Sequence, residues 1–207
     1  MKLSTLILLF LIIGCNLNPK VKSTKNTDYT KTIKNETKPM QDGKDITEPA
    51  SWDTIVLGDI NNDKISDTAF IYTPPVLKHV NNENELQFYL DCVEGYCYNL
   101  IHFSCKIPTF KIENSVWGSI ENIGDLNDDG FSELIFSPNW FTSCWGNLYI
   151  YSFDGKQWKR ISEVEYYNCA EESLKSHVKK INDKYYLKGL KIVDGDDKEY
   201  KVEIKIK

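Results

Sequence analysis

Two short acidic segments carry residue types that bind a divalent cation. Residues 58–67 read GDINNDKISD, and residues 124–133, which follow sixty-six positions later, read GDLNDDGFSE. After the opening glycine, oxygen-bearing side chains stand at loop positions one, three, five and nine, and an apolar residue stands at position seven. Calcium in proteins takes about six to eight oxygen ligands, and a tightly turning loop supplies them by directing alternate side chains inward. This spacing therefore predicts a calcium-binding loop in each segment.

The predicted ligands are side-chain oxygens together with one backbone carbonyl in each loop. In the first loop they are the side chains of Asp59, Asn61, Asp63 and Asp67 and the carbonyl of Ile65. In the second loop they are the side chains of Asp125, Asn127, Asp129 and Glu133 and the carbonyl of Phe131. We expect Asn62 and Asp128 to point outward. Because carboxylates crowded in one loop repel one another, a calcium ion would neutralise that repulsion and would have a structural role.

The two loops differ at position six, and both also have a simpler interpretation. A sharp turn at this position is easy for Gly130, whereas Lys64 meets a steric penalty in a left-handed conformation. The simpler interpretation is a pair of polar β-turns, in which Asp and Asn side chains bond their own backbone. The sequence therefore favours metal binding more in the second loop than in the first.

Residues 58–72 and 124–138 resemble the FG-GAP or VCBS repeat of integrin-α-like β-propellers, in which such a loop lies between two strands of a blade. Residues 146–151 are similar to a later strand of such a blade. A closed propeller has about four to eight blades. Residues 51–207 leave room for only about two to three units of this length. The resemblance therefore implies an all-β fold, an antiparallel meander of blade-like units that does not close into a ring.

Strand signals dominate the chain after residue 51. Short runs rich in β-branched and aromatic residues lie at 54–57, 68–72, 86–90, 98–103, 134–136 and 148–153. The pairs Asp154-Gly155, Asn182-Asp183 and Asp194-Gly195 predict tight hairpin turns. Residues 200–207 alternate apolar and charged side chains, as in a strand with one buried face. Residues 172–181 could instead form a short helix.

The N-terminal residues have the layout of an exported lipoprotein. Lys2 precedes the apolar run 3–13, which is typical of a signal peptide and too short to span a bilayer. Gly14-Cys15 resembles the lipobox of bacterial lipoproteins, which implies cleavage before Cys15 and membrane anchoring through fatty acyl chains, such as palmitate, on that cysteine. The alternative is an ordinary secretory signal. The second residue of the mature chain is Asn16 and not Asp, so the chain lacks the inner-membrane retention signal of other lipoproteins, and this resemblance favours the outer membrane if the host has one.

Composition divides the chain into three parts. Residues 1–14 are the predicted signal peptide, and residues 15–50 are the lipidated cysteine with a polar tether that cannot bury enough apolar surface to fold. Residues 51–207 are the predicted single β domain. The net charge is −5 and the lysines are scattered, which argues against nucleic acid as a partner.

The cysteines of the folded part predict two disulfides and one thiol in an oxidising compartment. They are Cys92, Cys97, Cys105, Cys144 and Cys169. If the chain turns at Asp154-Gly155, Cys144 and Cys169 lie near the open end of one hairpin, and a bulge would absorb the unequal lengths of its arms. The second bond would then join two of the other three. A zinc site is the alternative, but the chain has no C-x₂-C pair and only 3 histidines.

Aromatic residues concentrate in the segment 139–145, where Trp140 and Trp145 are candidate contacts for a sugar ring or a partner protein. The alternative is that these rings fill the core beside a disulfide. Neither G-x-S-x-G nor H-E-x-x-H occurs, so we expect a protein without catalytic activity. The expected function is an envelope-anchored module that binds a protein or a glycan. A hydrolytic enzyme or an enzyme-accessory subunit of the cell envelope is the alternative.

Overall fold

The computed structural model of the 207-residue chain describes residues 43–81, 87–141, 143–169 and 173–206. All of them belong to one compact unit, residues 38–207. The predicted signal peptide, Cys15 and the tether up to residue 42 lie outside the described residues. Within the described part, no helix is both long enough and apolar enough to cross a bilayer.

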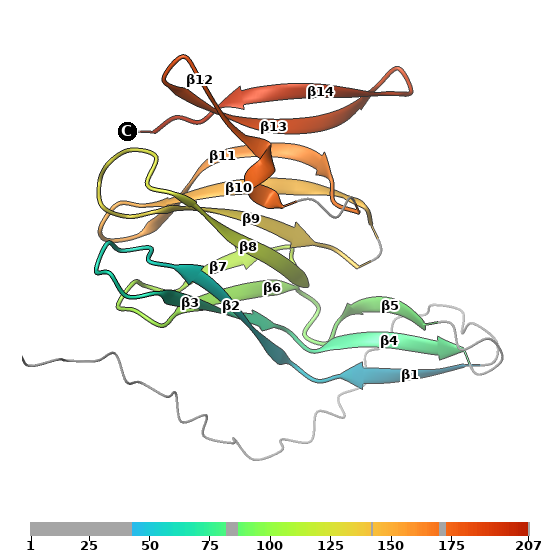
Figure 1. The fold of residues 1–207 in the computed structure, drawn as a ribbon. Helices are drawn as coiled ribbons and strands as arrows, with labels where there is room; N and C mark the ends of the chain where they lie inside the picture. The colour runs from blue at the N-terminus through green and yellow to red at the C-terminus, as the bar shows by residue number, and fades with distance from the viewer. Residues whose placement is uncertain (1–42, 82–86, 142, 170–172, 207) are drawn as a thin grey trace, which may run out of the picture. The chain divides into compact units, whose positions relative to one another are not determined.

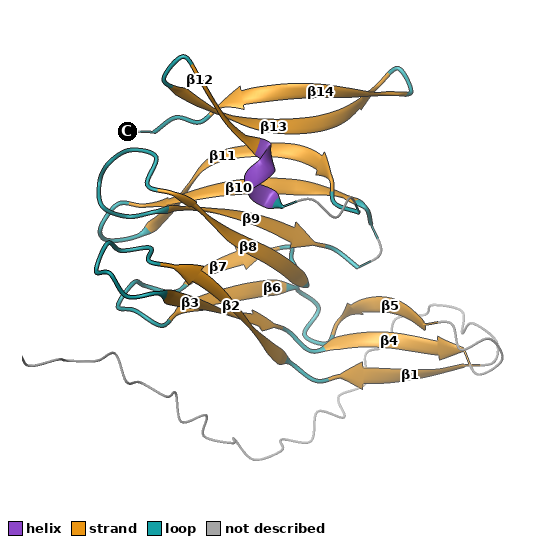
Figure 2. Ribbon diagram, viewed as in Figure 1, coloured by secondary structure: helices purple, strands orange, loops and turns teal. Residues whose placement is uncertain are grey.

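Four antiparallel sheets make up the fold, and none of them closes into a barrel (Figure 1; Figure 2). The only helical element among the described residues is a single 3-10 turn, η1 (Leu174–His177). The predicted all-β, antiparallel and open fold is therefore confirmed.

Two of the sheets are four-stranded meanders. The first sheet has the order β2-β3-β6-β7, with the bounds β2 (Ser51–Gly58), β3 (Asp67–Thr73), β6 (Tyr98–Phe103) and β7 (Phe110–Glu113). The second sheet has the order β8-β9-β10-β11, with the bounds β8 (Trp117–Gly124), β9 (Glu133–Asn139), β10 (Trp145–Phe153) and β11 (Trp158–Tyr167). The first two strands of each sheet form a hairpin, since β2 pairs with β3 and β8 pairs with β9. One acidic loop connects the two strands of each hairpin.

The other two sheets have three strands each. The side sheet has the order β1-β4-β5, with the bounds β1 (Gly43–Glu48), β4 (Val76–Asn81) and β5 (Gln87–Cys92). The third sheet is the C-terminal meander β12 (Val178–Ile181), β13 (Lys184–Val193) and β14 (Asp196–Glu203). Because β1 pairs with β4, β structure begins before Ser51, the predicted start of the domain.

The two larger clusters of the hydrophobic core form layers on either side of the second sheet. The first layer joins it to the first sheet through residues such as Ile71, Ile101 and Phe136. The second layer joins it to the third sheet through residues such as Ile150 and Leu187. Figure 1 shows the three sheets one above another in this order. Both faces of β9 are therefore covered, which explains why this strand is buried from its first residue to its sixth.

The hairpin turns lie where the sequence predicts them, whereas the segment 172–181 differs. Asp194 has a φ of 56° and Gly195 a φ of 88°, between β13 and β14, which is the left-handed backbone that a tight turn needs. In the described part of 172–181, only η1 is helical, and the chain continues as β12. Val178 pairs with Leu187 of β13, so strand pairing overrides the helical spacing of the apolar residues.

Both disulfides agree with the prediction. Cys144 bonds Cys169 with their Cα atoms 5.1 Å apart, and a bulge between Ile150 and Tyr151 interrupts the register of the hairpin that they close. Cys92 bonds Cys97, which settles the pairing that the sequence left open. Cys105 is a free and buried thiol.

Candidate cation-binding loops

The two acidic loops have the same backbone course. Left-handed φ angles recur at matching positions, which are Gly58 and Gly124, Asn62 and Asp128, and Lys64 and Gly130. Lys64 holds a φ of 69°, where the sequence predicts a steric penalty, and Gly130 holds a φ of 90°. The first loop thus adopts the same turn as the second although it lacks the glycine.

The carboxylate at position one organises the first loop. Oδ2 of Asp59 accepts a hydrogen bond from the backbone N–H of Lys64 at 2.8 Å, and Oδ1 accepts from Asn61 and Asp63 at 3.2 Å. Burial by itself would raise the pKa of Asp59, but these backbone donors outweigh it and lower the pKa. Asp59 is therefore ionised at neutral pH.

The second loop repeats this network at the matching atoms. Oδ2 of Asp125 accepts from the N–H of Gly130 at 2.8 Å, and Oδ1 accepts from Asp129 at 3.2 Å. Oδ1 of Asp129 accepts from Phe131 at 2.9 Å, as Oδ1 of Asp63 does from Ile65 in the first loop at 2.8 Å.

The amide at position three points to position five in both loops. Nδ2 of Asn127 donates to Oδ2 of Asp129 at 2.9 Å, and Nδ2 of Asn61 donates to Oδ2 of Asp63 at 3.0 Å. The side chains at positions one, three and five therefore gather around each turn.

The carboxylate at position nine is buried at the start of the next strand. Asp67 is 2% exposed and Glu133 is 0% exposed. Oδ2 of Asp67 accepts from the N–H of Ile60 at 3.1 Å, and Oε2 of Glu133 accepts from the N–H of Leu126 at 2.7 Å. Each of these bonds ties the end of the loop to its second residue.

The second oxygen of Glu133 distinguishes the second loop from an ordinary polar turn. Oε1 is buried and has no hydrogen-bond partner among the described residues. Burial raises the pKa of Glu133, and the charges of Asp129 and Asp125 act in the same direction, against the Leu126 N–H and the nearby Ser152 hydroxyl. A buried carboxylate oxygen without a partner is unfavourable, so this atom is suited to a positively charged ligand.

The structure brings the predicted ligands of each loop to one turn, but not to a closed cage. Among the His, Cys, Asp and Glu side chains of the described part of the chain, only Asp91, Cys92 and Cys97 place three ligand atoms within 4.8 Å of one another. Both sulfur atoms of that group are in a disulfide, so it is not a metal site. The carboxylates of either loop would have to move closer together to share an ion.

The two loops are also bonded to each other. The N–H of Ser132, next to Glu133, donates to the carbonyl of Ile60, next to Asp59, at 2.9 Å. Nδ2 of Asn122, just before the second loop, donates to the carbonyl of Leu57 at 3.1 Å. These two hydrogen bonds therefore hold the two loops next to each other.

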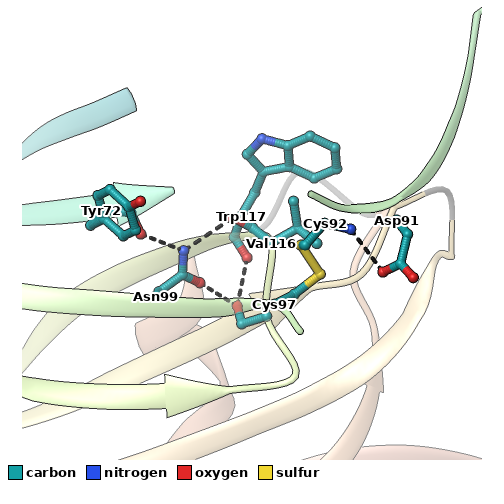
Figure 3. Close-up of a disulfide and its surroundings, with 8 residues drawn as sticks. Tyr72, Asp91, Cys92, Cys97, Asn99, Val116 and Trp117 are labelled. Carbon is teal, nitrogen blue, oxygen red and sulfur yellow. Dashed lines mark hydrogen bonds between the residues drawn. A yellow bond between two sulfur atoms is a disulfide. The ribbon is translucent and has the colours of Figure 1, made fainter. Parts of the chain in front are cut away.

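The Cys92–Cys97 disulfide closes the turn between β5 and β6 and packs beside the start of β8. Asn99 donates from Nδ2 to the carbonyl of Tyr72 at 2.8 Å and to that of Val116 at 3.0 Å, beside the disulfide (Figure 3). Val116 packs with both cysteines in one cluster. This arrangement fixes the start of β8, the strand whose far end leads into the second loop.

The candidate ligand contacts Trp140 and Trp145 lie on either side of the bend between β9 and β10. Trp140 is 43% exposed and packs edge-on against Phe141, with ring centroids 5.1 Å apart. Trp145 is half-buried and packs edge-on against Tyr167 at 5.5 Å, next to the Cys144–Cys169 disulfide. Of the two, Trp140 has the larger surface for a partner.

Sequence reasoning missed one further feature, a cavity of about 480 Å³ between the second sheet and the third sheet. Ser137, Tyr166 and His177 contribute to its wall. They come from β9, β11 and η1, which only the folded chain brings together, so no local pattern marks them.

Searches against protein-family models, curated proteins and solved structures found no match to this chain.

Proposed function

We propose that this protein is a non-catalytic binding module of the bacterial cell envelope, anchored by a lipid on Cys15 and stabilised by calcium in its two acidic loops. The single observation that carries the calcium proposal is the buried, unpartnered Oε1 of Glu133 at the end of a loop whose other carboxylates face the same turn. The matching hydrogen bonds of the first loop support a second, similar site. This geometry supports the resemblance to FG-GAP or VCBS loops.

A structural role for the ion follows from the place of the loops. Each loop closes a hairpin, and its last carboxylate is the first residue of β3 or β9. An ion that draws position nine toward positions one, three and five would fix the entry of the chain into that strand. Calcium fits this oxygen-rich set because its coordination is flexible in number and geometry.

Thermal melting in calcium and in EDTA tests the proposal. For a dissociation constant of about 0.1 mM, about 1 mM free calcium stabilises one site by about 1.4 kcal/mol. In a domain of this size that corresponds to a rise of about 3–6 °C in melting temperature for each site. A melting temperature that neither reagent changes would refute the proposal.

Neighbouring residues of the second loop provide a matched pair of variants. Asp129→Asn removes a proposed ligand, and we expect at least a tenfold loss of calcium affinity at this loop. Asp128→Asn removes the same charge one position away, at an exposed residue with a left-handed φ of 61° that asparagine also adopts. We expect this control to bind calcium within about twofold of the wild type; equal losses in both variants would show that only net charge matters.

The lipid anchor has an independent test. Cells that express the wild type should incorporate radioactive palmitate into the protein and retain it in the membrane fraction. Cys15→Ser should lose both the label and the membrane association. Label in the serine variant would contradict the proposed anchor without affecting the calcium proposal.

A further inference from the structure

The cavity between the second and third sheets lies where small or polar residues replace the aliphatic residues of the second core layer. On the face of β9 toward the third sheet, Ile135 is buried in the core. The next two side chains on that face, Ser137 and Asn139, line the cavity instead. On β8, Ile123 packs against the same core layer, whereas Ser119 on the same face lines the cavity. Small and polar side chains thus replace aliphatic ones where the cavity opens.

Because the two loop segments repeat at a spacing of sixty-six residues, the first sheet shows which residues stand at the positions that match the cavity wall. Sixty-six residues before Glu121 and Ser137 stand Ile55 and Ile71. Ile71 is buried in the first core layer, and Ile55 packs against that layer. The first sheet therefore packs against the second sheet through isoleucines at these two positions. At the matching positions facing the third sheet, the second sheet has the carboxylate of Glu121 and the hydroxyl of Ser137, which line the cavity.

The two carboxylates that line the cavity already have partners in the protein. Glu121 accepts hydrogen bonds from Ser173 Oγ at 2.7 Å, from the N–H of Leu174 at 3.0 Å and from the N–H of Lys175 at 3.1 Å. Glu199 pairs with Lys188 at 2.5 Å. Because one ion pair and three hydrogen bonds already satisfy these carboxylates, we expect the cavity to favour an uncharged ligand.

The remaining wall combines ring faces with neutral hydrogen-bonding groups. Trp117, Tyr166 and Tyr167 supply aromatic surface, and Ser137 and Asn139 supply a hydroxyl and an amide. Tyr166 is held in place by a hydrogen bond between its hydroxyl and that of Ser137.

His177 adds a hydrogen-bond acceptor, because the nearby carbonyl of Lys188 determines which ring nitrogen carries the proton. Its Nδ1 lies 3.2 Å from the carbonyl of Lys188, which can only accept a hydrogen bond. Nδ1 therefore carries a proton, and in the neutral ring Nε2 is an acceptor. Hydroxyl groups of a ligand can donate to such an atom.

We infer that this cavity binds a neutral saccharide of about one or two pyranose rings. A volume of about 480 Å³ is within the usual range for small-ligand sites, about 300–1,000 Å³. Sugar rings present C–H faces that pack on aromatic rings and hydroxyls that bond to serine, asparagine and histidine. The inference rests on the proposed binding role and names its ligand, but it does not depend on calcium.

The test replaces Ser137 with isoleucine, the residue at the matching position 71 of the first sheet, so that the larger side chain fills the cavity. The full-length protein is titrated with glucose, N-acetylglucosamine and their β-1,4-linked disaccharides, by calorimetry and by tryptophan fluorescence. We expect saturable binding of at least one of these sugars. Ser137→Ile should weaken that binding at least tenfold. Tyr167→Ala, a change at a 42% exposed position, should weaken it similarly if the isoleucine variant does not fold.

Tyr96→Ala is the matched control for Tyr167→Ala, because Tyr96 is exposed and does not line the cavity. It should bind the sugar within twofold of the wild type. The inference is wrong if none of the four sugars binds, if glucuronic acid or a tripeptide binds more tightly, or if Ser137→Ile and Tyr167→Ala both bind as the wild type does. Repeating the titration in EDTA separates the two proposals, since the sugar should still bind when calcium stabilisation is absent.

Discussion

Glu133 is the residue at which burial and charge conflict most directly. Glu133→Gln keeps an oxygen that can accept from the Leu126 N–H and removes the buried charge. We expect the variant to melt at or above the wild-type temperature in EDTA at pH 7, because it no longer buries a carboxylate without a second partner. It should also lose most of the calcium-dependent rise in melting temperature. Full retention of that rise would remove Glu133 from the site.

Cys105 gives a second prediction at the scale of a single residue. Burial raises the pKa of its thiol to about 12, and the hydrogen bond and charge of Asp67 contribute in the same direction. The reactive thiolate is therefore almost absent at pH 8. We expect iodoacetamide to leave Cys105 unmodified in the native protein and to alkylate it in denaturant, as read by peptide mass spectrometry. Rapid alkylation of the native protein would contradict the buried position.

The connection between the second sheet and η1 depends on the protonation state of Glu121. Burial by itself would raise the pKa of Glu121, but Ser173, Lys175 and Leu174 donate to it and lower the pKa below the ordinary value of 4.5. The ionised group therefore stabilises the fold above about pH 4.5. This contribution is lost as the pH falls through the lowered folded-state pKa.

Glu121→Gln should show this dependence in pH-resolved melting. At pH 7 we expect the variant to be less stable by about 1–3 kcal/mol, because an amide is a weaker acceptor for three donors. The difference from the wild type should shrink as the pH falls below 4.5 and through the lowered pKa of Glu121. Equal melting temperatures at pH 7 would show that these hydrogen bonds contribute little.

The two disulfides should contribute unequally because they close loops of different length. Cys144 and Cys169 are separated by 25 positions, and Cys92 and Cys97 by 5. In the chain-entropy model the long loop contributes about 3–4 kcal/mol and the short one about 2 kcal/mol. We expect the double Cys→Ala variant of the first pair to unfold at lower urea concentration than that of the second pair. The reverse order would indicate that strain or packing dominates over loop entropy.

At the scale of the whole molecule, local sequence patterns predict the strands and turns, but they do not predict a site that forms between two sheets. The Asp194-Gly195 turn and the Cys144–Cys169 bond were predictable because each depends on one hairpin. The segment 172–181 was not predictable, because helical spacing competes there with pairing to β13. The cavity also left no local signal, since its wall combines single residues from distant strands, among them Ser137 and Tyr166.

The most direct test of the calcium loops is an anomalous-difference map from crystals grown with calcium. If the second loop binds calcium, a peak should lie about 2.3–2.6 Å from oxygens of Asp125, Asp129 and Glu133. An equivalent peak in the first loop would show that Lys64 does not prevent binding. Calcium binding by these loops is ruled out if calcium is present in the crystals, no peak lies in either loop, and Asp125 and Asp129 point into solvent.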